Sequence, residues 1–237
     1  MNDTLISDPR VLDGMKTQLS VRAARLQAGS RRLGWKAGFG APAALEQFRL
    51  AGPLVGFMLE EARLDSGTTV SLAGWTKPVA EPEIAVWMGA DLDGGQDEAA
   101  VRAAIAGLGP AIELADLNPP PTDVAEILAG NIYHRHVILG DCDTGRAGGS
   151  LDDIECRVTR GGNTLPVTTE LEGNTGRILD VVGHIASTLS SCGELLRRGD
   201  VIICGSILPP LFLEPADTAV WHALSPLGTV SVDLTYG

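Results

Sequence analysis

The sequence predicts an α+β fold with a mixed, curled β-sheet and flanking helices. Many short apolar runs bounded by Gly, Pro and Asn indicate strands, whereas few segments carry helical periodicity. The two kinds of segment do not alternate regularly, which disfavours a doubly wound parallel sheet. The 237 residues suffice for one large domain, or for a domain with a small appendage.

The N-terminal half begins with a predicted helix from Asp8–Pro9 to about Gly29. Asp8 suits a helix cap, Pro9 suits the first turn and Gly29 suits the end. The elements expected next are loops, a small helix and short strands within 31–72, a strand at 83–92, an Ala-rich helix at 97–109, an apolar strand at 110–118 and a short helix within 119–131.

The C-terminal half is predicted to add further strands around one long helix. The helix spans 174–200, with a break near Cys192–Gly193, and its apolar residues recur at helical spacing. The strands are expected at 136–140, at 154–169 with a hairpin turn at 161–163, at 201–208 and at 228–237.

Composition restricts the function classes. Hydrophobic residues make up 44% of the chain and charged residues 20%, which is typical of a soluble globular protein. The formal net charge of −12 argues against nucleic acid or an anionic membrane as a partner. The four cysteines are widely spaced, and the start lacks the features of a signal peptide. We therefore expect reduced thiols and a cytoplasmic protein.

The stretch "PVAEPEIAVWM", residues 78–88, carries two acids on an apolar run. Alternation along a strand places Glu81 and Glu83 on one face, and Pro82 with the following apolar residues on the other. Because burying two unpaired anions is costly, a Lys, an Arg or a divalent metal is expected between them. Pro82 cannot donate to a ladder, which indicates an edge or a bulge at this point.

Other residues could complete a site. Glu113 in "AIELAD" would give a third carboxylate, and three acids suit Mg²⁺ or Mn²⁺; a solvated acidic face is the alternative. Lys36 lies among three glycines in "GWKAGFG" and would meet an anionic substrate, or else face solvent. The adjacent acids Glu60 and Glu61 are typical of a solvated helix or turn. His134 and His136 fall on one face of a strand and could form a transition-metal pair. No further nitrogen or sulfur ligand lies near the histidines in the sequence.

Taken together, "GWKAG", "GFMLEEARLDSG", "PVAEPEIAVWM", "AIELAD", "GN" and "GDVIICGSI" resemble the 2-keto-4-pentenoate hydratase and 4-oxalocrotonate decarboxylase branch of the fumarylacetoacetate hydrolase family, in consistent order over residues 30–237. The resemblance implies a β roll or curled barrel with flanking helices. It also implies a helical region, 1–50, packed on a catalytic domain, 51–237.

The resemblance implies roles for particular residues. It assigns the metal to Glu81, Glu83 and Glu113, and the active-site lysine to Lys36. It places the paired acids that handle protons at Glu60 and Glu61, and substrate contacts at Asn131 and Ser206. The implied reaction is addition of water to a 2-hydroxy-2,4-dienoate, a lyase reaction of aromatic catabolism. Decarboxylation, keto–enol tautomerisation and a non-catalytic binding subunit are the alternatives. A homo-oligomer is expected, with a decarboxylase as a further partner.

Two departures from the family pattern concern substrate recognition. No arginine follows "AIELAD", and "YHRH" replaces the small residues that usually follow the family's Asn. If the strand alternates from Tyr133, then Tyr133 and Arg135 share one face and His134 and His136 the other. Arg135 is therefore expected to replace the missing arginine and to bind a second substrate carboxylate, with a solvent-facing Arg135 as the alternative.

Overall fold

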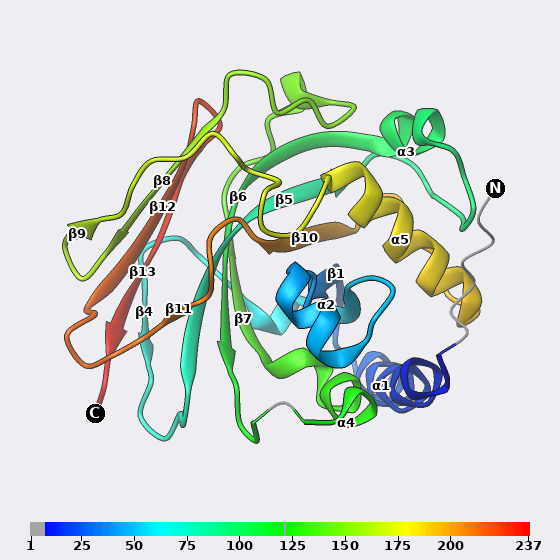
Figure 1. The fold of residues 1–237 in the computed structure, drawn as a ribbon, viewed down its shortest axis with the longest axis horizontal. Helices are drawn as coiled ribbons and strands as arrows, with labels where there is room; N and C mark the ends of the chain where they lie inside the picture. Colours follow the sequence, from blue (N-terminus) through cyan, green and yellow to red (C-terminus); the bar gives the residue numbers. More distant parts are fainter. Residues whose placement is uncertain (1–7, 121) are drawn as a thin grey trace.

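A curled eight-stranded sheet forms the centre of the molecule in the computed structural model, which describes residues 8–120 and 122–237 (Figure 1). Its strands run in the order β2 (Leu54–Leu59), β1 (Arg32–Gly38), β10 (Val201–Ser206), β5 (Pro78–Met88), β6 (Ile105–Asp116), β7 (His134–Leu139) and β3 (Arg63–Leu64), and β11 (Leu211–Phe212) also pairs with β5. Two pairs are parallel, β1 with β10 and β3 with β7, and the other pairs are antiparallel. The expected mixed, curled sheet is confirmed.

A second, five-stranded sheet packs beside it, on the left of Figure 1. Its order is β4 (Thr68–Ser71), β13 (Gly228–Thr235), β12 (Ala219–Ser225), β8 (Glu155–Arg160) and β9 (Asn163–Thr164). The β8–β9 pair is the hairpin expected around Gly161–Gly162, and β13 is the expected final strand. Buried His222 of β12 joins the sheets through a hydrogen bond between its Nδ1 and the carbonyl oxygen of Ala111 on β6, 2.9 Å apart.

Helices cover the open side and the ends of the curled sheet (Figure 1). They are α1 (Pro9–Gln27), α2 (Pro42–Phe48), α3 (Glu98–Ala104), α4 (Val124–Ala129) and α5 (Ile178–Ser191), with short 3₁₀ turns η1 (Glu60–Ala62), η2 (Asn131–Tyr133) and η3 (Thr144–Arg146). The Asp8 side chain caps α1 by accepting the Arg10 N–H at 2.9 Å, as expected. Within the described residues, no helix is long and apolar enough to span a membrane.

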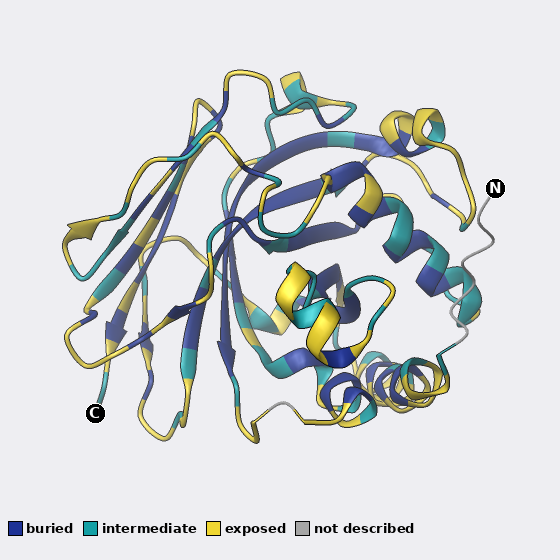
Figure 2. Cartoon of the chain, in the orientation of Figure 1, coloured by how far each residue is buried: buried dark blue, intermediate teal, exposed yellow. Residues whose placement is uncertain are grey.

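Strand β5 shows the predicted alternation. Ile84, Val86 and Met88 lie in the main hydrophobic core, whereas Glu83 and Ala85 face the other side of the sheet. Figure 2 shows β5 and β6 almost entirely buried, while the outer face of α2 is exposed. Pro82 fits this inner strand because β10 is irregular where it passes, with a register shift between Ile203 and Ser206.

One predicted element is wrong in part. The Ala-rich segment 97–109 is helical only to Ala104, and Ile105 begins β6. Tertiary pairing overrides helix propensity here because Gly107 and Gly109 allow close approach of neighbouring chain. A Cβ on Gly107 would lie 2.5 Å from the carbonyl oxygen of Asp143, and one on Gly109 would lie 2.3 Å from that of Asp141.

The expected boundary at residue 50, between a helical region and a catalytic domain, would separate strands of the same central sheet. Strand β1 lies between β2 and β10, so residues 32–38 are part of the sheet rather than of a helical region packed on it. Helices α1 and α2 do lie at its periphery, and residues 1–7 of the expected helical region fall outside the described residues.

Candidate active site

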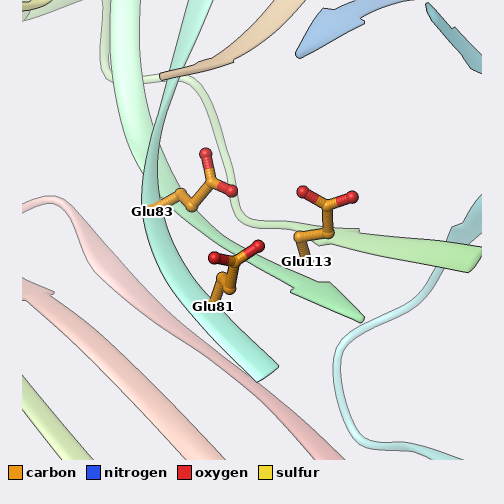
Figure 3. Close-up of side chains that lie close together, drawn as sticks. All are labelled: Glu81, Glu83 and Glu113. Atoms are coloured by element: carbon orange, nitrogen blue, oxygen red, sulfur yellow. The ribbon is translucent and has the colours of Figure 1, made fainter. Parts of the chain in front are cut away.

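Three glutamates converge where β5 pairs with β6. The antiparallel register places Glu81 opposite Glu113, and Glu83 follows on the same face of β5. One carboxylate oxygen from each residue lies within 4.8 Å of the other two. Figure 3 shows the three carboxylates pointing into one space from two adjacent strands. The predicted convergence is confirmed, and the cause is the strand period of two combined with this register.

Buried oxygen atoms in this cluster lack partners. Glu83 and Glu113 are fully buried, yet among the residues that the structure describes neither Oε1 of Glu83 nor Oε2 of Glu113 has a hydrogen-bond donor. The second oxygen of Glu83 accepts the backbone N–H of Gly205 at 2.6 Å. Unpaired buried carboxylate oxygens are costly, so this cluster fits a bound cation by its donor set and by its unsatisfied atoms.

Lys36 brings a positive charge to the glutamates from β1. Its side chain is buried, and Nζ donates to Oε1 of Glu113 and to the carbonyl oxygen of Ile132, the latter at 3.3 Å. One ammonium faces three carboxyl groups, so the cluster retains excess negative charge when all three are ionised. The prediction that Lys36 is a site residue agrees with this position.

His134 is the second donor to Glu113. Its Nδ1 lies 2.7 Å from Oε1 of Glu113, and its side chain is buried. The sequence indicated His134 and His136 only as a weak candidate for a metal pair. In the structure His136 stacks on Trp75 instead, with ring centroids 6.2 Å apart. Lys36 and His134 together occupy one oxygen of Glu113 and leave the other free.

The carboxyl pKa values differ across the cluster. Burial, together with the charge of Glu113, raises the pKa of Glu81 to about 7. Burial and the two neighbouring carboxylates raise the pKa of Glu83 well above its usual value. Burial alone would raise the pKa of Glu113 too, but the charge of Lys36 and the hydrogen bond from His134 outweigh it and lower this pKa. Glu113 is therefore the acid most readily ionised without a metal.

A cavity of about 530 Å³ opens beside the cluster, within the usual size of small-molecule sites of roughly 300–1,000 Å³. Lys36, Glu81 and Ser206 all line it. Ser206 is buried, and its Oγ has no hydrogen-bond partner within residues 8–120 and 122–237, which is consistent with the predicted substrate contact. The Asn174 side chain fixes this wall by donating to the carbonyl oxygen of Ser206 at 2.7 Å.

Asn131 has a different position from the one expected. Its side chain accepts the N–H of Phe57 and donates to the carbonyl oxygen of Phe57, both at 2.9 Å. The oxygen and the nitrogen of the side-chain amide are thus both bonded to the backbone of Phe57, and Asn131 does not line the cavity. We correct the expected substrate contact: Asn131 anchors the turn that presents Ile132 and its carbonyl oxygen to Lys36.

Arg135 also departs from expectation. Its side chain is exposed and does not line the 530 Å³ cavity. Its guanidinium lies over the Trp75 ring, and one nitrogen is 3.5 Å from Oδ2 of Asp116. Tyr133 reaches this cavity without Arg135 because residues 131–133 have φ values of 54°, 53° and 61°, so strand alternation begins only at His134. The expectation that Arg135 faces the glutamates is therefore corrected.

Glu60 and Glu61 lie outside the cavity as well. They border a shallow surface pocket with 29–31, where Glu61 accepts the Ser30 hydroxyl at 2.6 Å and pairs with Arg25 at 3.1 Å. Their turn, η1, follows β2 beyond the sheet position of Lys36. The structure does not bring these two acids, which were expected to handle protons, to the cluster of Glu81, Glu83 and Glu113.

Three contributions to the site were not anticipated from the sequence: the Gly205 N–H, the Asn174 amide and the Glu113 contact of His134. The polar turn "EGNTG" and the bulge-prone "CGS" were the available signals. Neither signal identifies the residue that will be contacted. Gly205 and Glu83, for example, are 122 residues apart in sequence.

Comparison with known proteins gives consistent results. The family model described as "Fumarylacetoacetate (FAA) hydrolase C-terminal" matches residues 40–234. The chain is 28% identical over 231 residues to a 2-hydroxyhexa-2,4-dienoate hydratase of Comamonas testosteroni, covering 95% of this chain and 86% of that protein. It is 26% identical over 239 residues to a 2-keto-4-pentenoate hydratase of Paraburkholderia xenovorans, covering 98% and 84%.

The fold is similar to that of a solved structure, 4-oxalocrotonate decarboxylase from Pseudomonas putida G7 in complex with magnesium and adipate. The TM-score is 0.85 at 23% identity, and the match covers 95% of this chain and 86% of that one. The likeness supports the fold that positions the glutamates.

Proposed function

Because the chain belongs to the fumarylacetoacetate hydrolase family, we propose that it is a divalent-metal-dependent hydratase of a small 2-hydroxy-2,4-dienoic acid. The observation that carries the proposal is the convergence of Glu81, Glu83 and Glu113 beside Lys36 at a cavity of small-molecule size. The names of the two hydratase relatives support the reaction type.

Glu81, Glu83 and Glu113 would hold the metal through their carboxylate oxygens. This donor set consists of hard oxygen atoms and suits Mg²⁺ or Mn²⁺. When bound, the ion would supply Lewis-acid stabilisation of negative charge on the substrate's 2-oxygen.

The protein's own residues would orient the substrate. Lys36 Nζ is the buried ammonium at the cavity and would hold a substrate oxygen on which negative charge develops. Ser206 Oγ would donate a hydrogen bond to another substrate oxygen. His134 would keep Glu113 oriented through its Nδ1 contact. Glu60 and Glu61 have no part in the proposal because they border a different pocket.

The proposed reaction has two parts. The 2-hydroxydienoate first ketonises: the 2-hydroxyl loses its proton and C5 gains one. Water then adds to the conjugated double bond, its oxygen to C4 and its proton to C3. Decarboxylation, tautomerisation alone and a non-catalytic binding role remain the alternatives, and the homo-oligomer and decarboxylase partner expected from the resemblance stay predictions.

The test is incubation with 2-hydroxypenta-2,4-dienoate, with and without Mg²⁺, and identification of products by NMR. The expected product is 4-hydroxy-2-oxopentanoate, formed only with metal. A product that stops at the oxo acid would indicate a tautomerase, and carbon dioxide released from 2-oxo diacids alone would indicate a decarboxylase. Mg²⁺ binding without turnover of any of these acids would indicate a binding subunit.

A matched pair of lysine variants sharpens the test. Lys36→Met should lower turnover strongly, because it removes the buried ammonium at the cavity. Lys16→Met, on the exposed face of α1, should leave turnover unchanged. Equal rates in the two variants would remove Lys36 from the proposed mechanism.

A further inference from the structure

The cavity wall is chemically divided. Its ionisable carboxyl and amine groups, Lys36 and Glu81, come from β1 and β5. Small or apolar residues contributed by other segments form much of the remainder, among them Phe39, Ala43, Ala44, Leu117, Val181 and Phe212. A ligand whose polar head meets the glutamates therefore has its remaining part against uncharged side chains.

No free cation faces this uncharged wall among the residues that the structure describes. Lys36 is the only lysine or arginine among them that lines the cavity, and it already contacts Glu113 and the carbonyl oxygen of Ile132. Arg135 is paired with Asp116 outside the cavity. Lys77 lies over the Phe212 ring at 4.7 Å and is not part of the lining.

We propose that this wall receives an uncharged, apolar substituent at the far end of the substrate, and that the small side chain of Ala44 of α2 leaves the space for it. The inference rests on the proposed function for the identity of the polar head. A second carboxylate at the far end would lose its hydration without gaining a cation, which is strongly unfavourable. A methyl or larger alkyl group would instead gain about fourfold in binding for each buried carbon.

Helix α2 supplies this small residue on the side that lines the cavity. Ala43, Ala44 and Gln47 share one side of the helix and line the cavity, whereas Glu46 is exposed and does not. Figure 1 shows α2 on the open side of the curled sheet. Because alanine side chains are small, they leave space that a larger residue at the same position would fill.

The direct test compares two substrates that differ only at the far end. 2-Hydroxyhexa-2,4-dienoate ends in a methyl group, and 2-hydroxyhexa-2,4-dienedioate ends in a carboxylate. With Mg²⁺ present, the methyl compound should have a kcat/KM at least about tenfold higher. An equal or higher value for the dienedioate would overturn the inference.

A binding measurement separates this inference from the proposed function. Calorimetric titration with 2-oxohexanoate and 2-oxohexanedioate, each with Mg²⁺, requires no turnover. Tighter binding of 2-oxohexanoate by at least about tenfold supports the apolar wall even if no dienoate is hydrated, in which case only the proposed function fails. Tighter binding of the dioate, or equal or undetectable binding of both, overturns the inference.

Two variants of one helix test the role of Ala44. Ala44→Leu should lower the kcat/KM ratio of hexadienoate to pentadienoate by at least about fourfold, and the affinity ratio of 2-oxohexanoate to 2-oxopentanoate likewise. Glu46→Leu, on the exposed side, is the control and should leave both ratios unchanged. An unchanged ratio in Ala44→Leu, with α-helical circular dichroism preserved, would contradict the assignment.

Discussion

Strand β1 contacts two clusters of buried charge, one through Trp35 and one through Lys36. Adjacent residues of a strand point to opposite faces, so the two clusters lie on different sides of the sheet. On the first side Trp35 meets Asp200 and Arg22. On the second, Lys36 meets the glutamate cluster. Both clusters contain buried carboxylates. They differ in how far cations and hydrogen-bond donors of the protein balance the carboxylate charge.

In the Asp200 cluster the protein itself supplies the charges that balance the buried carboxylate. Asp200 Oδ2 accepts the Trp35 indole N–H at 3.2 Å and the Arg197 N–H at 2.9 Å, while Oδ1 forms an ion pair with Arg32 at 2.8 Å. Arg22 stacks on Trp35 and lies 3.3 Å from Glu194. Within the described residues Oδ1 of Asp200 accepts no hydrogen bond, but the Arg32 guanidinium balances its charge, so the protein itself supplies a cation there.

In the glutamate cluster, one buried oxygen each of Glu83 and Glu113 has neither a donor nor a cation in the described part of the chain. Burial by itself therefore does not distinguish function from structure in this molecule. Unsatisfied carboxylate oxygens beside a third acid that lines a cavity, Glu81, do, because the energetic cost of keeping them is recovered only when a ligand binds. Four predictions test this difference.

The largest effect is expected from Glu83→Gln. It removes one of three carboxylates, and we expect Mg²⁺-dependent turnover to fall by more than about 100-fold. The unfolding free energy of the metal-free protein should not decrease, because the substitution removes a carboxyl group whose ionised form is disfavoured by burial. Kinetics and urea unfolding measure the two effects. Normal turnover, or a large loss of stability, would place Glu83 with Asp200 as a structural residue.

Asp200→Asn should show the opposite pattern. An amide NH₂ would face the donors of Trp35 and Arg32, so the unfolding free energy should fall by about 2–3 kcal/mol. Mg²⁺ affinity should change little. Asp233→Asn, an exposed position on β13, is the control and should cost less than about 0.5 kcal/mol. A stable Asp200→Asn protein with weakened Mg²⁺ binding would contradict the structural role of Asp200, because Asp200 would then contribute to metal binding as the glutamates do.

A smaller effect is expected for His134→Ala. Loss of its contact with Oε1 of Glu113 should weaken Mg²⁺ binding about tenfold, measured by calorimetry. His134→Asn, whose amide can occupy the place of Nδ1, should recover part of the affinity. His136→Ala should have little influence, since that ring stacks on Trp75. Equal losses at both histidines would contradict the assigned contact.

The smallest effect concerns pH. Burial and the Glu113 charge raise the pKa of Glu81 to about 7 from 4.5, so the folded protein retains a proton that the unfolded chain releases. Stability should therefore fall as pH rises from 4.5 to 7, by about 1 kcal/mol, since Glu81 is partly exposed at the cavity. Metal-free wild type should show this loss relative to Glu81→Gln in urea unfolding, and a pH-independent difference would contradict it.

The sequence predicted the parts of the site that follow from local rules. The strand period of two placed Glu81 and Glu83 together, and the glycine-flanked Lys36 was identified as a candidate. The mixed, curled sheet followed from short strands without regular alternation with helices. The metal itself stays a proposal.

Residues 131–136 could not be assigned from the pattern. Three successive positive φ values shift the start of alternation to His134, and of these residues only Asn131 is of a type that favours such a backbone. Arg135 consequently turns to Asp116, and His134 takes the contact with Glu113. The helix predicted at 97–109 is wrong beyond Ala104 for a related reason. Pairing with β5 over Ile105–Asp116 outweighs the local helix propensity.

The alternation of β1 also restricts how this chain can change in length. Gly34 holds β1 close to β10, since a Cβ there would lie 1.8 Å from the carbonyl oxygen of Val201. One residue inserted or deleted between Gly34 and Trp35 would exchange the two faces, moving the indole toward the acids and the ammonium toward Arg22. A substitution of Trp35 or of Lys36 alone would affect mainly one cluster, whereas an odd change in length would abolish both clusters at once. Insertions in related sequences, or in engineered libraries, should therefore be found in surface loops such as 141–152 and be absent from residues 34–36.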